Sequence, residues 1–147
     1  MFKQWANNSF LILVMRFVMG GAIFMHGAQK VLGWYGGPGL DGIINGMSKM
    51  GVPPFAAYLS AYTEFAGGIL LIIGLLTRVS AFANIINMLV AIYLVHISKG
   101  FFSSGGGFEL PLFYLTLAFL IFLTGPGAIS IDNFIFKDTG TNNNSKK

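Results

Sequence analysis

The sequence contains no cysteine and few charged residues, and both shortages narrow the functions that the chain can perform. Without cysteine the chain alone offers no disulfide exchange, thiolate nucleophile, iron–sulfur cluster, c-type haem attachment or cysteine-based zinc site. Any sulfur chemistry would therefore take place on a partner. Charged residues make up 10% of the chain and hydrophobic residues 54%, whereas soluble domains carry roughly 25% charged residues. This balance indicates an integral membrane protein.

Basic charge is also limited. The formal net charge is +4, and the lysines are scattered near the ends of apolar segments, as is typical of residues that flank a membrane. No basic stripe is present that would bind a phosphate backbone, so we expect a lipid bilayer and not nucleic acid as a partner. The first apolar run is longer than the roughly 7–15 residues of a signal-peptide core, and no small-x-small cleavage site follows it. We therefore interpret it as a retained span.

Four apolar segments have the length of membrane-spanning helices or come close to it. They cover about residues 10–32, 55–76, 79–97 and 109–124. The hydrocarbon core of a bilayer is about 30 Å thick and a helix rises about 1.5 Å per residue, so a spanning helix needs about 20 residues. Segment 33–54, rich in glycine and proline, is expected to be an extramembrane or re-entrant loop with a short helix near 40–50. Thr77 and Arg78 are expected to form the turn between the second and third spans, and the fourth span to contribute packing more than chemistry.

These segments predict the fold class and the division of the chain. We expect an all-α, integral membrane four-helix bundle in residues 1–137, followed by a disordered polar tail in residues 138–147. Four spans place both termini on one side of the membrane. That side holds Lys3, Arg78, Lys137, Lys146 and Lys147, against Lys30, Lys49 and Lys99 on the other. The excess of basic residues predicts that the termini are cytoplasmic.

Helical spacing places glycines and polar residues on shared faces. Arg16, Gly20 and Gly27 recur along one face of the first span. Glu64 and Gly68 lie on one face of the second span. Small residues allow membrane helices to approach closely, so we expect these faces to pack against neighbouring helices, and such a face would also suit a homodimer.

Seven polar or ionisable residues in the spans are candidate ligand-binding residues. A charge inside the bilayer costs at least a few kcal/mol unless it is paired, so such groups are expected to face one another. Counting about 1.5 Å per residue from the side of the termini predicts a single polar column that contains Arg16, Asn84, Asn87 and Glu64, with the histidines near its outer end. The candidates are Arg16, His26, Lys30, Glu64, Asn84, Asn87 and His96.

Several interpretations of this column stay open. Its members could simply hydrogen-bond to one another and set the helix register. They could also line a pocket for an amphipathic ring such as a quinone, whose carbonyls need donors and whose reduction needs protons. His26 and His96 could ligate haem, or a metal together with Glu109. No ligand spacing such as H-x-x-x-H supports that site, so we predict no metal and assign no catalytic residue.

Short motifs in the same segments resemble the DoxX family of small bacterial membrane proteins. They are the arginine of the first span, HGAQK at residues 26–30, EFAGG at 64–68, GLLTR at 74–78 and GPG at 125–127, which precedes Ser130 and Asp132. The resemblance implies a four-helix bundle in the bacterial inner membrane that is linked to redox metabolism. One branch of the family is similar to a membrane subunit of a thiosulfate:quinone oxidoreductase, which implies a soluble or membrane-bound redox partner.

Three functions follow as hypotheses. In the first, the chain is a quinone-binding subunit of a redox complex, in which Arg16 orients the quinone, Glu64 relays protons, and His26 with Lys30 shapes the outer mouth. In the second, the chain is a non-enzymatic anchor or assembly partner that recruits a soluble enzyme through segment 33–54 or through its tail. In the third, the polar column conducts a small molecule or protons. Only the first makes the chain part of an oxidoreductase.

Overall fold

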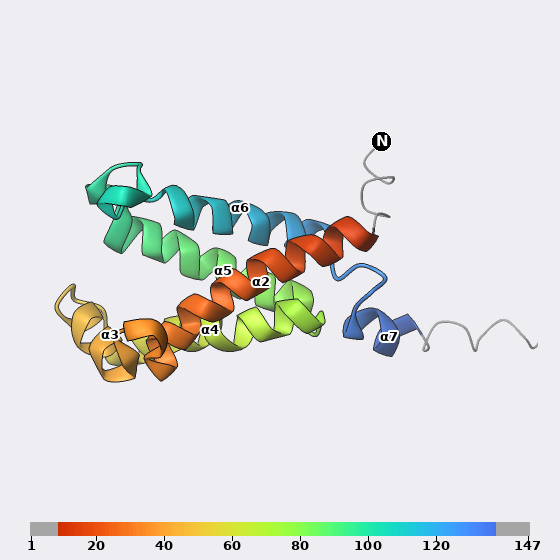
Figure 1. The fold of residues 1–147 in the computed structure, drawn as a ribbon, viewed down its shortest axis with the longest axis horizontal. Coiled ribbons are helices and arrows are strands. Elements are labelled where there is room, and N and C mark those ends of the chain that lie inside the picture. The colour runs from red at the N-terminus through yellow and green to blue at the C-terminus, as the bar shows by residue number, and fades with distance from the viewer. Residues whose placement is uncertain (1–8, 138–147) are drawn as a thin grey trace, which may run out of the picture.

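The computed structural model describes residues 9–137, and four long helices dominate this part of the chain (Figure 1). They are α2 (Ser9–Leu32), α4 (Pro54–Ile73), α5 (Thr77–Ala91) and α6 (Glu109–Thr124). A π-helical turn, η2 (Ile92–His96), and a 3-10 turn, η3 (Ile97–Lys99), extend α5. Within the described residues no strand is present. The predicted all-α, four-helix membrane bundle is confirmed.

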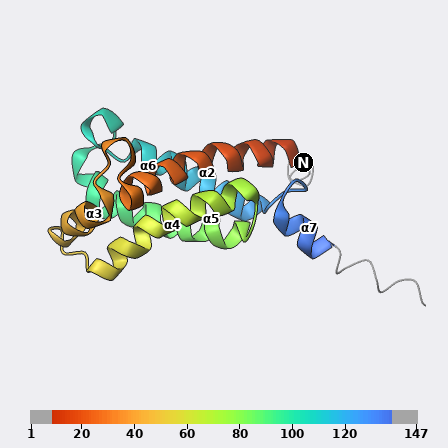
Figure 2. The same ribbon diagram turned by 60° about the horizontal axis from the view of Figure 1, so that its bottom comes forward.

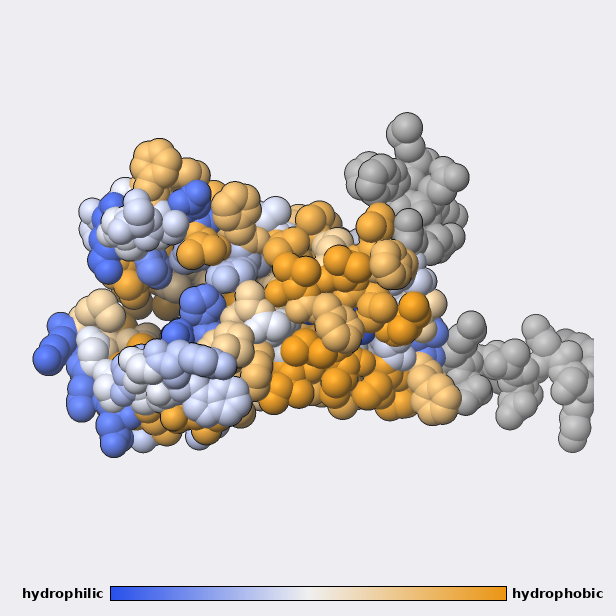
Figure 3. Space-filling view, viewed as in Figure 1, coloured by the Kyte–Doolittle hydropathy of each residue, from blue (hydrophilic) through white to orange (hydrophobic). Residues whose placement is uncertain are grey.

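The bundle has the dimensions and surface of a membrane protein. Three helical segments are long and apolar enough to cross a bilayer: Ser9–Leu32, Pro54–Ile73 and Thr77–Lys99. The fourth, α6, is apolar too but has only 16 residues. Hydrophobic side chains cover the middle and right of the surface in Figure 3, whereas hydrophilic groups gather at the left end. This distribution fits a bilayer around the middle of the bundle.

The turn between α4 and α5 lies earlier in the chain than the sequence pattern predicts. The second span was expected to reach residue 76, but α4 ends at Ile73, where Gly74 takes a left-handed conformation with φ of +70°. Helix α5 then begins at Thr77, so Thr77 and Arg78 belong to the helix and not to the turn. The carboxylate of Asp132 accepts hydrogen bonds from the amides of Leu76 (2.7 Å) and Thr77 (2.8 Å). This distant carboxylate satisfies amides at the start of α5, which otherwise lack partners.

Shorter elements form the two ends of the bundle. Helix α3 (Gly39–Ser48) and the turn η1 (Trp34–Gly36) connect α2 to α4, which confirms a short helix in the predicted loop. The connection from α5 to α6 contains the turn η4 (Ser103–Gly105). These connections form two lobes at the end opposite the start of α2 and α7 (Ile131–Lys137), as Figures 1 and 2 show. The predicted disordered tail lies outside the described residues.

Helices α2 and α4 pack backbone against backbone through glycines. A Cβ atom added to Gly27 would lie 2.3 Å from the amide nitrogen of Phe65, and one added to Gly68 would lie 2.5 Å from the amide nitrogen of Phe24. A Cβ atom added to Gly20 would lie 2.8 Å from the carbonyl oxygen of Gly68. The expectation that the glycine faces pack against neighbouring helices is confirmed, because no side chain would fit at these positions.

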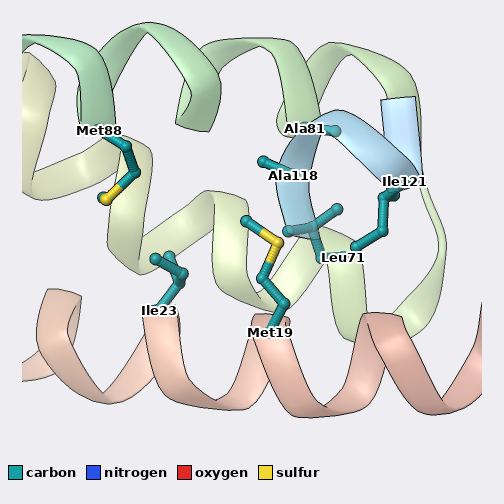
Figure 4. Packing of buried hydrophobic residues seen from close by; sticks show 7 residues of the cluster. All are labelled: Met19, Ile23, Leu71, Ala81, Met88, Ala118 and Ile121. Atoms are coloured by element: carbon teal, nitrogen blue, oxygen red, sulfur yellow. The ribbon is translucent and has the colours of Figure 1, made fainter. Parts of the chain in front are cut away.

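A single hydrophobic cluster joins the four long helices (Figure 4). Met19 and Ile23 reach it from α2, Leu71 from α4, Ala81 and Met88 from α5, and Ala118 and Ile121 from α6. Ile23 and Met88 also line the cavity that is described below. The core therefore forms the floor of that cavity.

Candidate functional site

Arg16 is buried in the bundle and bonded to backbone carbonyls. Its side chain is 1% exposed. The guanidinium donates from Nε to Leu71 (3.0 Å), from Nη2 to Ile72 (3.2 Å) and from Nη1 to both Ile129 (2.9 Å) and Pro126. Leu71 and Ile72 belong to the last turn of α4, whose carbonyls have no partner within the helix. Arg16 therefore ties the end of α4 to the segment that follows α6.

Glu64 forms a second, separate polar centre. Its Oε1 atom accepts hydrogen bonds from Lys30 Nζ at 2.6 Å and from Asn87 Nδ2 at 3.0 Å. Three helices, α2, α4 and α5, thus converge on one buried carboxylate, which is 3% exposed. Arg16, which was predicted to share one polar column with Glu64, bonds to carbonyls at the end of α4 and not to this carboxylate.

Asn84 lies between these two centres and contributes to helix packing. It is fully buried, and its Nδ2 atom donates to the carbonyl of Ser80 within α5 at 2.9 Å. Ser80 donates through its hydroxyl to the carbonyl of Gly67 at 2.8 Å. Asn84 and Ser80 therefore fill the space that the absent side chain of Gly67 leaves between α4 and α5.

A cavity of about 240 Å³ adjoins the Lys30–Glu64 pair. Four of the seven predicted residues line it: His26, Lys30, Glu64 and His96. Asn87 supports the site through its bond to Glu64, whereas Arg16 and Asn84 are not in its wall. The remaining wall is mostly apolar and comes from α2, α5, α6 and the connection from α5 to α6. In Figure 3 a hollow lies between the two hydrophilic lobes at the left end of the molecule.

The two histidines of the cavity have different partners. His96 ends the π-helical turn, and its Nδ1 atom lies 2.6 Å from the carbonyl oxygen of Gly106. Because a carbonyl only accepts, Nδ1 carries the hydrogen and a neutral ring keeps an accepting lone pair at Nε2. The Nε2 atom of His26 lies 3.3 Å from the hydroxyl of Tyr114.

Within residues 9–137 no group of three or more His, Cys, Asp or Glu side chains is placed to hold a metal ion. The carboxylate of Glu109 instead accepts a hydrogen bond from the backbone amide of Ser103, at 2.9 Å.

Two parts of the cavity were missed in the sequence. Tyr114 enters the wall from α6, the helix that was expected to serve packing more than chemistry. Ser103, Gly106 and Gly107 enter it from the connection between α5 and α6. The position of Tyr114 in a largely apolar span was a signal that this side chain has a polar role. The conformation of the glycine-rich connection between α5 and α6 could not be predicted from its sequence pattern.

Comparison with known proteins gives matches along most of the chain. Residues 11–97 match the DoxX family, and residues 55–147 match a family described as "TQO small subunit DoxD". The chain is 32% identical to "Putative oxidoreductase CatD" of Bacillus subtilis, over 89% of this chain and 92% of that protein. It is 34% identical to "Inner membrane protein YqjF" of Escherichia coli, over 86% of this chain and 92% of that protein. No solved structure matches the chain significantly. The protein therefore belongs to the DoxX family of membrane proteins.

Proposed function

We propose that this chain is an inner-membrane subunit of a redox complex and that its cavity binds the ring of a quinone. The observation that carries the proposal is the ion pair of Lys30 and Glu64 at the wall of a mostly apolar cavity. Charged groups inside a membrane bundle are costly, and they commonly mark the path or the site of a polar ligand. This pair lies where a small molecule in the cavity would touch it.

The size and chemistry of the cavity support a ring of this class. A cavity of about 150 Å³ accommodates benzene, so a cavity of about 240 Å³ has room for a substituted six-membered ring. A quinone carbonyl needs a hydrogen-bond donor, which the ammonium of Lys30 supplies. Reduction of the ring needs protons, and the carboxylate of Glu64 and the Nε2 atom of His96 are groups that can accept a proton and pass it on. Arg16 has no part in this site, because all its nitrogens are bonded to carbonyls.

The comparisons support the redox setting in coarser terms. One matching family is described as a small subunit, and the name of the Bacillus subtilis relative includes the word oxidoreductase. A subunit without cysteine would leave sulfur chemistry to its partner. We therefore propose that the electrons are exchanged with a second protein and that this chain provides the membrane site for the quinone.

Replacing Glu64 with glutamine should weaken quinone binding. Glutamine keeps the shape of the side chain but removes the charge that holds the Lys30 ammonium in place. We expect the affinity for a short-chain quinone to fall at least about tenfold, or about 1.4 kcal/mol. Isothermal titration calorimetry on protein in lipid nanodiscs measures this. Asp41→Asn, on the exposed surface of α3, is the matched control and should bind normally. Equal affinity of Glu64→Gln and the wild type would remove the site from this cavity.

We also propose that the chain ends are cytoplasmic and that the cavity end faces the periplasm. Because the chain has no cysteine, single cysteines report the side of the membrane without background. A cysteine in place of the exposed Ser48, at the end of α3, should react with a membrane-impermeant maleimide in intact cells with a permeabilised outer membrane. One in place of Ser145 should react only after the inner membrane is opened. The reverse pattern would invert the proposed orientation.

A further inference from the structure

The cavity lies where α2 and α6 separate from each other. Near the chain ends these helices meet through the hydrophobic cluster, in which Met19 of α2 packs with Ala118 and Ile121 of α6. Toward the opposite end they diverge, as Figure 1 shows. Both helices line the cavity there, with His26 from α2 and Tyr114 from α6. We call the line along which α2 and α6 face each other at the cavity the α2–α6 seam.

A hydrogen-bonded pair crosses this seam. The hydroxyl of Tyr114 lies 3.3 Å from His26 Nε2, and the two rings meet edge to face with their centroids 5.7 Å apart. The residues next to the pair in the sequence, Met25 of α2 and Phe113 of α6, are apolar and are 38% and 60% exposed. Surfaces of this kind in a spanning helix face hydrocarbon. The pair thus separates a cavity that contains an ion pair from a lipid-facing surface.

We propose that the α2–α6 seam is a lateral portal between the bilayer and the cavity, and that His26 and Tyr114 form its gate. This inference rests on the proposed function, and it narrows the ligand to a ring that carries a long hydrocarbon chain. The cavity has room for the ring but not for such a chain as well. The chain leaves through the seam and stays in the lipid.

The chemistry of the other opening supports this route. Between the two lobes the wall contains Ser103 and Gly106, and hydrophilic groups gather on both lobes in Figure 3, beside exposed aromatic side chains such as Phe102. A hydrocarbon chain that left the cavity there would lie in water, which is unfavourable in proportion to its apolar surface. A chain that passes between Met25 and Phe113 remains in apolar surroundings. The ring therefore reaches the cavity from the membrane and not from solution.

Photolabelling tests the portal directly. The probe is a quinone with a decyl chain that carries an azide at its far end, bound to the protein in nanodiscs and irradiated. We expect the azide to label peptides of α2 and α6 that contain Met25 and Phe113, and an excess of unlabelled quinone to prevent this. Label on residues 100–108 or on α3 would overturn the portal, because the chain would then leave between the lobes.

Removal of the gating hydroxyl gives a second, independent readout. In Tyr114→Phe the ring stays but the hydrogen bond to His26 is lost. We expect the association and dissociation rates of the decyl quinone to rise together several-fold while the affinity changes little. Tyr58→Phe, on the exposed surface of α4, is the control and should exchange at the wild-type rate. Unchanged rates in Tyr114→Phe, or a loss of affinity at an unchanged association rate, would contradict a gate.

The two proposals fail in distinguishable ways. A chainless quinone and the decyl quinone are titrated in parallel against the wild-type protein. If neither binds, the proposed function is wrong. If both bind but the azide labels the lobes, the quinone site stands and the portal alone is wrong.

Discussion

Replacing Gly27 with alanine should push α2 away from α4 and destabilise the protein by about 3 kcal/mol, near the upper end of the usual cost of overpacking. The added Cβ would lie 2.3 Å from the amide nitrogen and 2.4 Å from the Cα atom of Phe65. Both atoms belong to the backbone of α4, so no side chain can turn aside to make room. The displaced segment carries Lys30 on α2 and Glu64 on α4. We therefore expect a lower melting temperature by circular dichroism in detergent, together with weaker quinone binding.

Gly21→Ala is the matched control for this experiment. Gly21 lies in the same helix, but no atom outside its own turns of that helix lies within 4 Å of the position that its Cβ would occupy. Alanine is favoured over glycine inside a helix by up to about 1 kcal/mol. The melting temperature of this variant should therefore stay the same or rise. A similar loss in both variants would show that the close approach of α2 and α4 is not what Gly27 provides.

Replacing Arg16 with methionine should also destabilise the bundle strongly. The substitution leaves the carbonyls of Leu71, Ile72, Pro126 and Ile129 without the donor that they now share. A buried polar group without a partner costs about 1–3 kcal/mol, so we expect a total loss of at least about 3 kcal/mol. Folded protein should accumulate poorly in membranes, and the recovered fraction should melt early in a detergent-solubilised thermal scan.

Two further arginine variants show whether the loss of stability comes from the planar arrangement of donors in the Arg16 guanidinium. Arg16→Lys keeps the charge but presents a compact ammonium that cannot reach four carbonyls in the same arrangement, so it should recover only part of the stability. Arg78→Gln changes an exposed arginine and should stay within about 0.5 kcal/mol of the wild type. Wild-type stability in Arg16→Met would contradict the structural role that we assign to Arg16.

The fold class could be predicted from the sequence because its signals are local. Length and hydropathy mark the four apolar segments, and the spacing of Gly20, Gly27 and Gly68 predicts faces that pack closely. The helix boundaries near residue 76 were harder to predict from the sequence. Asp132 supplies the acceptor for the first amides of α5, and it lies 55 residues further along the chain. No local pattern around Thr77 reports that contact.

The candidate site could be predicted in part. Counting residues along a helix gives the depth of a side chain, and it correctly placed Glu64 near Asn87. Depth does not give direction, however. Arg16 was grouped with Glu64 although its long side chain reaches the free carbonyls at the end of α4. The partners of such a chain are backbone atoms, which every residue has, so the sequence contains no signal for them.

The buried Arg16 and the half-buried Lys30 therefore have different tasks. Arg16 is bonded wholly to carbonyls and holds the end of α4 against the segment after α6. Lys30 is paired with Glu64 beside a cavity that is lined by α6 and by the connection that precedes it. Variants of Arg16 should change stability, whereas variants of Glu64 should change binding while the protein stays folded. Because binding and stability depend on different residues, the proposed quinone site can be tested with variants that remain folded.

The most direct test of the quinone site is mass spectrometry of the small molecules that the protein retains when it is purified in native lipid particles. The wild type, Glu64→Gln and the control Gly21→Ala are prepared in parallel from the same membranes. The account predicts that a quinone is retained by the wild type and by Gly21→Ala, and that Glu64→Gln loses it. A quinone retained equally by all three, or by none, would contradict a quinone site at the Lys30–Glu64 pair.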